Sequence, residues 1–146
     1  MVEDIDLRGA FGCAAFTLRK TARVITQAYD GAMRVGGLRS TQFTILVAVH
    51  RSQPLSIGKL AKVVLMSPAT MTRSLALLKN EGLVDIAPRG PRREKHVRLT
   101  DAGRRALART APLWRKAQQR FELMYGIQSW SQLRRELDRV AQLRGE

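Results

Sequence analysis

The hydrophobic pattern of this 146-residue chain changes its period, and this change limits the folds open to it. Up to Gly82, apolar residues recur at the three-to-four-residue spacing of helices. In the segments 84–87 and 96–99 they recur at every second position instead, as in short β-strands. From Thr100 the helical spacing returns. The pattern predicts a mainly α-helical protein of the α+β class, with about six helices and one small β-hairpin.

Start and stop signals divide the first half of the chain into helices. An apolar stripe over residues 11–33 predicts one long helix, which the pair Gly36-Gly37 ends. A second helix is expected from Ser40, as its cap, to the turn at 52–54. A third, short helix is expected to start with Ser56 as its cap, because Leu55 and Leu60 take the N′ and N4 places of a hydrophobic staple. The predicted apolar positions are Phe11, Ala14, Ala15, Leu18, Ala22, Ile25, Tyr29 and Met33 in the first helix, and Phe43, Leu46, Val47 and His50 in the second.

A strong restart signal follows the third helix. Ser67 can accept a hydrogen bond from a free backbone N–H, and Pro68 suits the first helical position, where its missing N–H costs nothing. The resulting fourth helix runs to about Asn80, and Gly82 supplies a left-handed exit. Two helices of unequal length joined by about three residues have the spacing of a helix-turn-helix.

The loop of the predicted hairpin is strongly basic. It spans Pro88 to Lys95, is too long for a tight two-residue turn, and is expected to project as a wing. Between residues 89 and 98, five basic side chains accompany a single acid, in a chain whose formal net charge is +14. Concentrated positive charge favours a polyanion, because each neutralised phosphate releases condensed counterions. Next to a helix-turn-helix, the basic hairpin predicts contact with nucleic acid.

The last third of the chain predicts two more helices. Thr100 caps the first of them, and Pro112 lies inside it, where it favours a kink or a break. The second is expected to begin at Ser129, which forms a capping box with Gln132. A small lobe cannot cover every terminal helix, so a second subunit is the expected cover. The apolar stripes are Leu107, Leu113, Trp114, Ala117, Phe121 and Met124, then Trp130, Leu133, Leu137, Val140 and Ala141.

Composition excludes several classes of protein. Apolar residues make up 45% of the chain, enough for a core and too many for a disordered polycation. One cysteine and two histidines exclude an internal disulfide and a dedicated zinc site. The sequence carries no catalytic signature, so we expect neither an enzyme nor a cofactor or metal. The acidic residues 1–6 and the short apolar run 43–49 favour a cytoplasmic protein with no membrane partner.

Five segments, in this order and spacing, resemble the MarR family of bacterial winged-helix regulators, and the resemblance covers nearly the whole chain. They are Leu38-Arg39-Ser40-Thr41-Gln42-Phe43, Leu60-Ala61, Ser67-Pro68-Ala69-Thr70-Met71-Thr72-Arg73, Leu78-Lys79-Asn80-Glu81-Gly82-Leu83-Val84 and Leu99-Thr100-Asp101-Ala102-Gly103. Each segment alone is a weak signal, whereas the five together are specific.

The resemblance implies a homodimeric, sequence-specific regulator of transcription, usually a repressor. Residues 1–37 and 106–146 would form interlocking dimerisation helices, and residues 38–105 a winged helix-turn-helix lobe on a pseudo-palindromic double-stranded DNA operator. Many such proteins release DNA when a small, often aromatic, acid binds between lobe and dimer interface. This chain departs from the family in the wing, where Pro91 and Ile86 stand in place of a common Asp–Arg pair.

The predicted DNA contacts follow from helix geometry. If Met71, Leu75 and Leu78 are buried, the opposite face of the fourth helix enters the major groove, with Arg73 donating to guanine or phosphate. The wing would add phosphate or minor-groove contacts. The recognition-helix candidates are Ser67, Pro68, Ala69, Thr70, Thr72 and Arg73, and the wing candidates are Arg89, Arg92, Arg93 and Lys95.

Two further interpretations concern the first helix. Phe16, Arg19 and Arg23 are candidates for an aromatic wall and a carboxylate anchor of an effector pocket, although dimer packing and surface charge explain them equally well. A peroxide-sensing branch of the family uses a cysteine in this helix, but its position falls on Ala15 and not on Cys13. Cys13 is therefore expected to be a buried, inert residue.

One alternative function shares the positive charge: a nucleoid-associated or RNA-binding structural protein without sequence specificity. Such a protein would not need a capped recognition helix with a polar outer face. The two tyrosines and four phenylalanines are scattered, which argues against a surface for stacking single-stranded bases.

Overall fold

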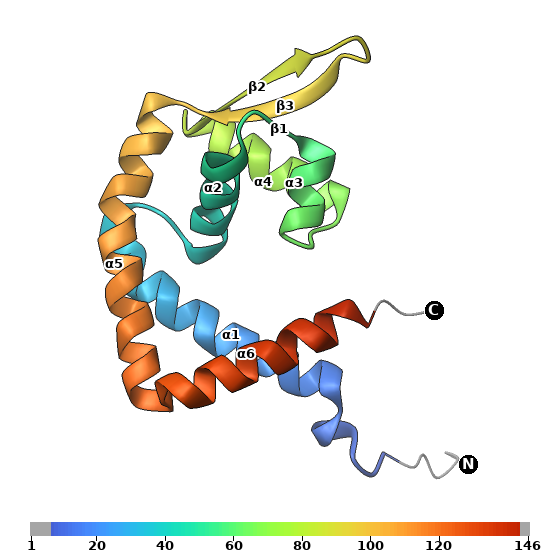
Figure 1. Ribbon diagram of the computed structural model, residues 1–146, viewed down its shortest axis with the longest axis vertical. Coiled ribbons are helices and arrows are strands. Elements are labelled where there is room, and N and C mark those ends of the chain that lie inside the picture. Colours follow the sequence, from blue (N-terminus) through green and yellow to red (C-terminus); the bar gives the residue numbers. More distant parts are fainter. Residues whose placement is uncertain (1–6, 144–146) are drawn as a thin grey trace, which may run out of the picture.

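The computed structural model describes residues 7–143, which form a winged helix-turn-helix lobe, a long connecting helix and two terminal helices (Figure 1). The mainly α-helical fold with a small β-hairpin is confirmed. The helices are α1 (Ala14–Met33), α2 (Ser40–Ser52), α3 (Ile57–Val63), α4 (Pro68–Asn80), α5 (Asp101–Tyr125) and α6 (Ile127–Gln142). The strands are β1 (Leu55–Ser56), β2 (Val84–Arg89) and β3 (Glu94–Leu99), and the 3-10 helices are η1 (Ala10–Gly12) and η2 (Arg34–Gly36).

The sheet has three antiparallel strands in the order β1-β3-β2. The two-residue strand β1 was not predicted, because two residues carry no alternation; it pairs Leu55 with Val97. The hairpin is also longer than predicted, since β2 and β3 pair as far as Arg89 opposite Glu94. Pro88 fits inside β2 because this is an edge strand, where a missing N–H breaks no ladder. The loop is therefore residues 90–93 and not Pro88 to Lys95.

The core of the lobe lies between α2, α3, α4 and the sheet. It includes Met71, Leu75 and Leu78 of α4, as the helical spacing predicts. The predicted stripe of α2 is partly wrong: His50 is exposed and Val47 half-buried, whereas Ile45 and Val49 are fully buried. The core residues are Met33, Leu38, Phe43, Ile45, Leu46, Val49, Leu55, Leu60, Ala61, Met71, Leu75, Leu78, Val84, Val97, Leu99 and Ala106.

Three predicted helix caps are confirmed. The side-chain oxygens of Ser56, Ser67 and Thr100 accept hydrogen bonds from the backbone N–H three residues later, at 3.3, 3.2 and 3.0 Å. Each bond satisfies one of the free donors of a first helical turn.

The cap predicted at Ser40 is wrong. Arg39 is the N-cap residue of α2, and its backbone N–H donates to Gln42 Oε1 at 3.0 Å. The Ser40 N–H donates instead to Asp30 Oδ1, at 2.6 Å. The acceptor lies on α1, so the start of α2 depends on a residue that local sequence signals do not point to.

The C-terminal helices also differ from the prediction. α6 begins at Ile127, two residues before Ser129, because Gly126 adopts a φ of 99° and lets the chain turn directly from one helix to the next. The Ser129–Gln132 capping box is therefore absent. α5 runs through Pro112 without a break. Pro112 removes one backbone bond, and packing of α1 and α2 along α5 offsets that loss.

The terminal helices carry apolar side chains that the protomer does not cover. α6 packs against α5, where the Phe121 and Trp130 rings meet edge to face at 5.1 Å, yet no residue of α6 is buried. In α1 only Met33 is buried. The exposed apolar residues on these elements and their flanks include Leu7, Phe11, Phe16, Leu18, Val24, Val35, Leu123, Met124, Tyr125, Ile127, Val140 and Leu143.

A polar contact also ties α1 to α5. The Tyr29 hydroxyl donates to Gln118 Oε1 at 2.6 Å, and Gln118 Nε2 donates to Glu122 at 2.7 Å. Partial burial, with a smaller contribution from the charge of Glu122, raises the pKa of Tyr29 above its ordinary value. Tyr29 is therefore a neutral hydrogen-bond donor at physiological pH.

Candidate nucleic-acid interface

The two helices of the helix-turn-helix meet at a tight turn. Leu65 takes a left-handed conformation with a φ of 53°, and the Met66 N–H donates to the Ala61 carbonyl at 2.9 Å, which closes the end of α3. Ser67 and Pro68 then start α4 at once, as predicted. The turn therefore fixes the N-terminal end of α4 relative to α3.

Hydroxyl groups at this end have distinct hydrogen-bonding roles. Ser67 Oγ accepts from the Thr70 N–H and also donates to Thr70 Oγ1, at 2.9 Å. The Thr70 hydroxyl keeps its own proton for a ligand. Thr72 Oγ1 donates to the Pro68 carbonyl at 2.9 Å, so its oxygen is left as an acceptor. The two threonines could thus serve a donor-specific and an acceptor-specific contact.

The outer face of α4 is open to solvent. All six predicted recognition residues are exposed, and Arg73 has no side-chain hydrogen bond or ion pair with any residue of the described range 7–143. An unpaired, exposed guanidinium can bind guanine or phosphate without first breaking another contact. The exposed residues are Ser67, Pro68, Ala69, Thr70, Thr72 and Arg73. Their contact with DNA stays a prediction.

We expect the Ser67 cap to be separable from DNA binding. Ser67→Ala removes the acceptor for the Thr70 N–H and should lower the free energy of unfolding by about 1 kcal/mol. Ser67→Asp keeps an acceptor and should preserve stability, but its charge should repel phosphate. Chemical denaturation and DNA titration of both variants measure the two effects. Equal stability of Ser67→Ala and the unmodified protein would contradict the capping role.

The wing is held without the family's usual ion pair. Ile86 is half-buried opposite Val97, so this position packs instead of carrying a charge. An exposed ion pair joins the strands nearby, between Arg98 and Asp85 Oδ2 at 3.1 Å. At the tip, the Arg93 N–H donates to the Gly90 carbonyl at 3.0 Å. The shape of the wing thus rests on this turn and on packing at its base.

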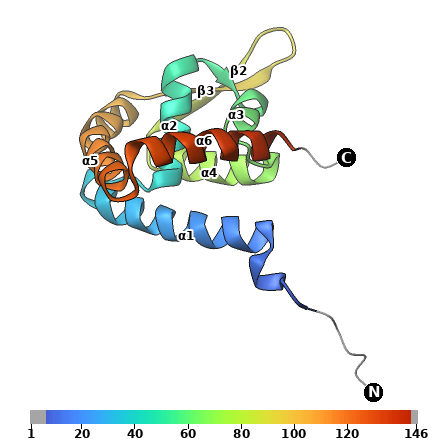
Figure 2. The same cartoon turned by 60° about the horizontal axis from the view of Figure 1, so that its bottom comes forward.

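The predicted wing contacts are also free for a ligand. The four basic side chains predicted to contact DNA from the wing are exposed, and within residues 7–143 they have no hydrogen-bond or ion-pair partner. The hairpin carries them away from the body of the lobe (Figure 2). They are Arg89, Arg92, Arg93 and Lys95.

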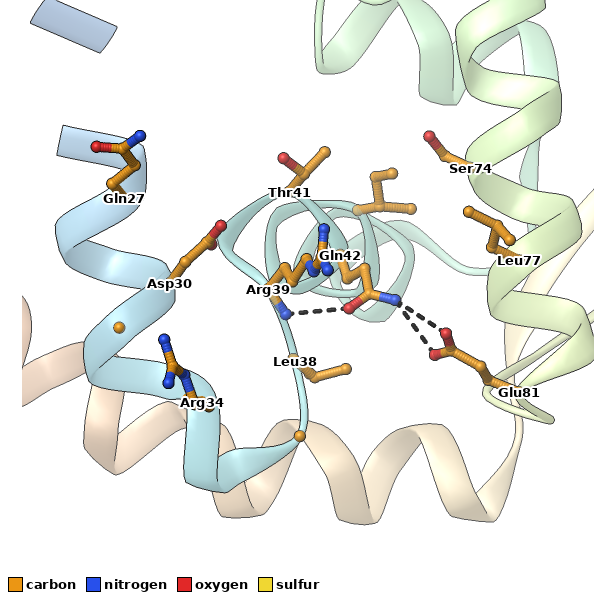
Figure 3. A pocket seen from close by; sticks show the side chains of 13 residues that line it. Gln27, Asp30, Arg34, Leu38, Arg39, Thr41, Gln42, Ser74, Leu77 and Glu81 are labelled. Carbon is orange, nitrogen blue, oxygen red and sulfur yellow. Dashed lines mark hydrogen bonds between the residues drawn. The ribbon is translucent and has the colours of Figure 1, made fainter. Parts of the chain in front are cut away.

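A large groove lies between α1, α2 and α4, with a volume of about 1030 Å³ (Figure 3). Its lining includes Asp30 and Arg34 of α1, Gln42 of α2, and Leu77 and Glu81 at the end of α4. A smaller cavity of about 220 Å³ lies between α1, α2 and α5 beside Tyr29 and Trp114. Sequence reasoning missed the groove, because its walls come from three segments far apart in the chain.

The three predicted effector residues line neither this groove nor this smaller cavity. Phe16, Arg19 and Arg23 are exposed along the first half of α1, and their role stays a prediction. Cys13 was expected to be buried, and this is wrong. It is exposed and caps α1, with Sγ accepting from the Phe16 N–H at 3.3 Å.

Residues 7–143 offer neither a metal-binding cluster nor a helix that could span a membrane. Histidine, cysteine and acidic side chains form no cluster there that could hold a metal ion. None of the helices in this range combines the length and apolar character that crossing a membrane requires.

The chain is similar to a known protein family and to solved structures. The model of the MarR family matches residues 36–94. The transcriptional regulator MosR of M. tuberculosis, solved in complex with DNA, is 35% identical; the match covers 89% of this chain and 94% of that chain, with a TM-score of 0.82. A second crystal structure of MosR is also 35% identical to this chain. That match covers 89% of this chain and 93% of the MosR chain, with a TM-score of 0.77.

A more distant similarity supports the same fold. CouR from Rhodococcus jostii RHA1, solved with p-coumaroyl-CoA, is 20% identical, and the match covers 92% of this chain and 95% of that chain with a TM-score of 0.75. Curated protein sequences give no match to the chain. The family match over the lobe, together with the 35% identity to MosR over nearly its full length, shows that the chain belongs to the MarR family of DNA-binding transcriptional regulators.

Proposed function

We propose that this protein is a homodimeric repressor that binds a pseudo-palindromic operator and leaves it when a small effector binds. The observation that carries the proposal is the set of exposed basic side chains on α4 and the wing that have no partner within residues 7–143, in a fold similar to MosR solved with DNA. Recognition helices read base edges in the major groove, and wing arginines add phosphate contacts.

The uncovered terminal helices support dimerisation. Phe11 and Leu123 are each 82% exposed, and other apolar side chains near them on the same elements are also open to solvent. Exposed apolar side chains in such number favour a protein–protein interface. We propose that residues 1–37 and 106–146 form the dimer and residues 38–105 bind DNA. A two-fold dimer would place two recognition helices one DNA turn apart, about 34–36 Å.

An effector site is supported by the groove volume, which lies in the range of small-molecule sites. CouR, which has the same fold, is solved with an aromatic acyl-CoA. Phe16, Arg19 and Arg23 do not line this groove, so as candidates for an aromatic wall and a carboxylate anchor they would belong to a separate site between the lobe and the dimer interface on α1. Titrating the DNA-bound protein with p-coumaroyl-CoA and with simple aromatic carboxylic acids tests for release.

The test of DNA recognition is selection from random duplexes. We expect the selected sequences to contain an inverted repeat. At fixed physiological salt, the selected duplex should bind about 10³-fold or more tightly than a scrambled duplex. A ratio near one would instead support a coating protein without sequence specificity. This comparison cancels the phosphate attraction that any chain of charge +14 would show.

The test of assembly is the mass of the protein in solution and of its complex with the selected duplex. We expect a dimer in both cases, with two protomers on one duplex. A monomer at micromolar concentration that binds DNA singly would contradict the dimer, whatever the sequence preference.

A further inference from the structure

The recognition helix is tethered at its far end by a side-chain bridge to α2. Gln42 Nε2 donates to both carboxylate oxygens of Glu81, at 3.3 and 3.2 Å, and Gln42 Oε1 accepts from the Arg39 N–H at 3.0 Å (Figure 3). One amide group thus links the first turn of α2 to the residue that ends α4. The two residues are 39 positions apart in the chain.

This tether lies on a face of α4 that packing does not hold. Met71, Leu75 and Leu78 anchor the core face of α4. The face toward α2 opens into the groove instead, where Leu77 is 61% exposed and Ser74 half-buried. The bridge at Glu81 therefore crosses a space that apolar contacts leave open.

Glu81 is poorly placed for helix stability alone. It stands at the C-terminal end of α4, where the helix dipole disfavours negative charge. The Gln42 amide compensates by donating to both oxygens. An acid at this position is explained by the contact across the groove and not by the helix that carries it.

Because this bridge lies at the end of α4 opposite to the predicted DNA contacts, a small change of tilt there displaces those contacts. The 13 residues of α4 span roughly 20 Å, and the predicted DNA contacts begin at the opposite end, at Ser67. Because the turn at Leu65 fixes α3 to the start of α4, the two helices would tilt together, and a tilt of about 5° around the C-terminal end of α4 would move its N-terminal end by roughly 1.7 Å. Hydrogen bonds to base edges tolerate only a few tenths of an ångström.

We propose that Gln42 and Glu81 are positioning residues for operator recognition: their bridge sets the tilt of α4 and so the accuracy with which it reads bases. The proposal rests on the proposed function, because it concerns sequence preference. Neither residue needs to contact DNA. Loss of the bridge should weaken binding to the selected duplex more than binding to a scrambled one.

A donor–acceptor exchange tests this proposal. Gln42→Glu keeps an acceptor for the Arg39 N–H but sets two carboxylates against each other. The double variant Gln42→Glu with Glu81→Gln restores one amide and one carboxylate, with the original net charge. We expect the ratio of selected-duplex to scrambled-duplex affinity to fall about tenfold in the single variant and to return to within about twofold in the double.

The control for added negative charge is Gln132→Glu, on the exposed polar face of α6, with the mass of the variant in solution measured to show that its assembly is unchanged. It should lower affinity for both duplexes alike and leave their ratio unchanged. Thermal midpoints are measured for all variants. The proposed positioning role would be overturned if Gln42→Glu does not lower the ratio of selected-duplex to scrambled-duplex affinity. It would also be overturned if this ratio stays low in a double variant that folds normally. Absence of any preference in the unmodified protein would overturn the proposed function itself, before the variants are compared.

Discussion

Gly103→Ala is expected to lower the free energy of unfolding by about 3 kcal/mol, the upper end of the usual range for overpacking. A Cβ atom built on Gly103 would lie 2.0 Å from the Leu83 carbonyl oxygen and 3.0 Å from its carbon. Real Cβ atoms do not approach backbone this closely, so the first turn of α5 would have to move away from the start of β2.

That movement would disturb a hydrogen-bonded junction. The Leu83 carbonyl accepts from the Thr100 N–H at 3.2 Å, and the Thr100 hydroxyl donates to the Gly82 carbonyl at 2.6 Å while it caps α5. These bonds join both ends of the wing to the connecting helix. We therefore expect a fall of about 10 °C in the thermal midpoint, measured by calorimetry or circular dichroism.

The matched control is Gly31→Ala, a helical glycine with no atom within 4 Å of the added Cβ. Alanine there should stabilise the protein by roughly 0.5–1 kcal/mol, because it restricts the unfolded chain and favours the helix. Opposite signs for the two substitutions are the expected result. If Gly103→Ala is as stable as the unmodified protein, α5 does not approach Leu83 this closely.

The lobe could be predicted from the sequence because its signals are local. Ser67 and Pro68 are adjacent, and their effect on α4 needs no distant partner. The exposed face of α4 followed from the positions of Met71, Leu75 and Leu78, which are buried as expected. Once this stripe is known, helix geometry alone places Arg73 outside.

Several failures share a different cause, which is dependence on distant residues. The start of α2 uses Asp30 of α1, and β1 exists only because β3 lies beside it. Pro88 indicated a loop, but its place on an edge strand lets it pair. The Gln42–Glu81 bridge joins two ordinary polar residues, and no spacing rule connects them. A single sequence does not reveal such pairs.

We expect α4 to read bases and the wing to contact phosphate, and testing this difference gives the largest expected effect on DNA binding. Arg73→Ala should reduce affinity for the selected duplex by about 1–3 kcal/mol per half-site, or roughly 2–6 kcal/mol for a dimer on two half-sites. The lost affinity comes from one base pair in each half-site. Replacing that base pair in the duplex should therefore weaken binding of the unmodified protein but hardly change binding of Arg73→Ala. Affinity for scrambled DNA should fall far less.

Arg92→Ala should behave differently, because the wing is expected to contact phosphate. Affinity should fall for selected and scrambled duplexes alike, and the slope of log affinity against log salt should decrease by about 2 for a dimer, one for each lost phosphate contact. Arg135→Ala, on the exposed polar face of α6, removes the same charge away from the lobe and should leave the slope unchanged as long as its mass in solution matches that of the unmodified protein. Salt-dependent titrations of the three variants on both duplexes measure these effects. If Arg73→Ala and Arg92→Ala lose affinity equally on both duplexes, base reading does not lie in Arg73, and the outer face of α4 serves only as a phosphate clamp.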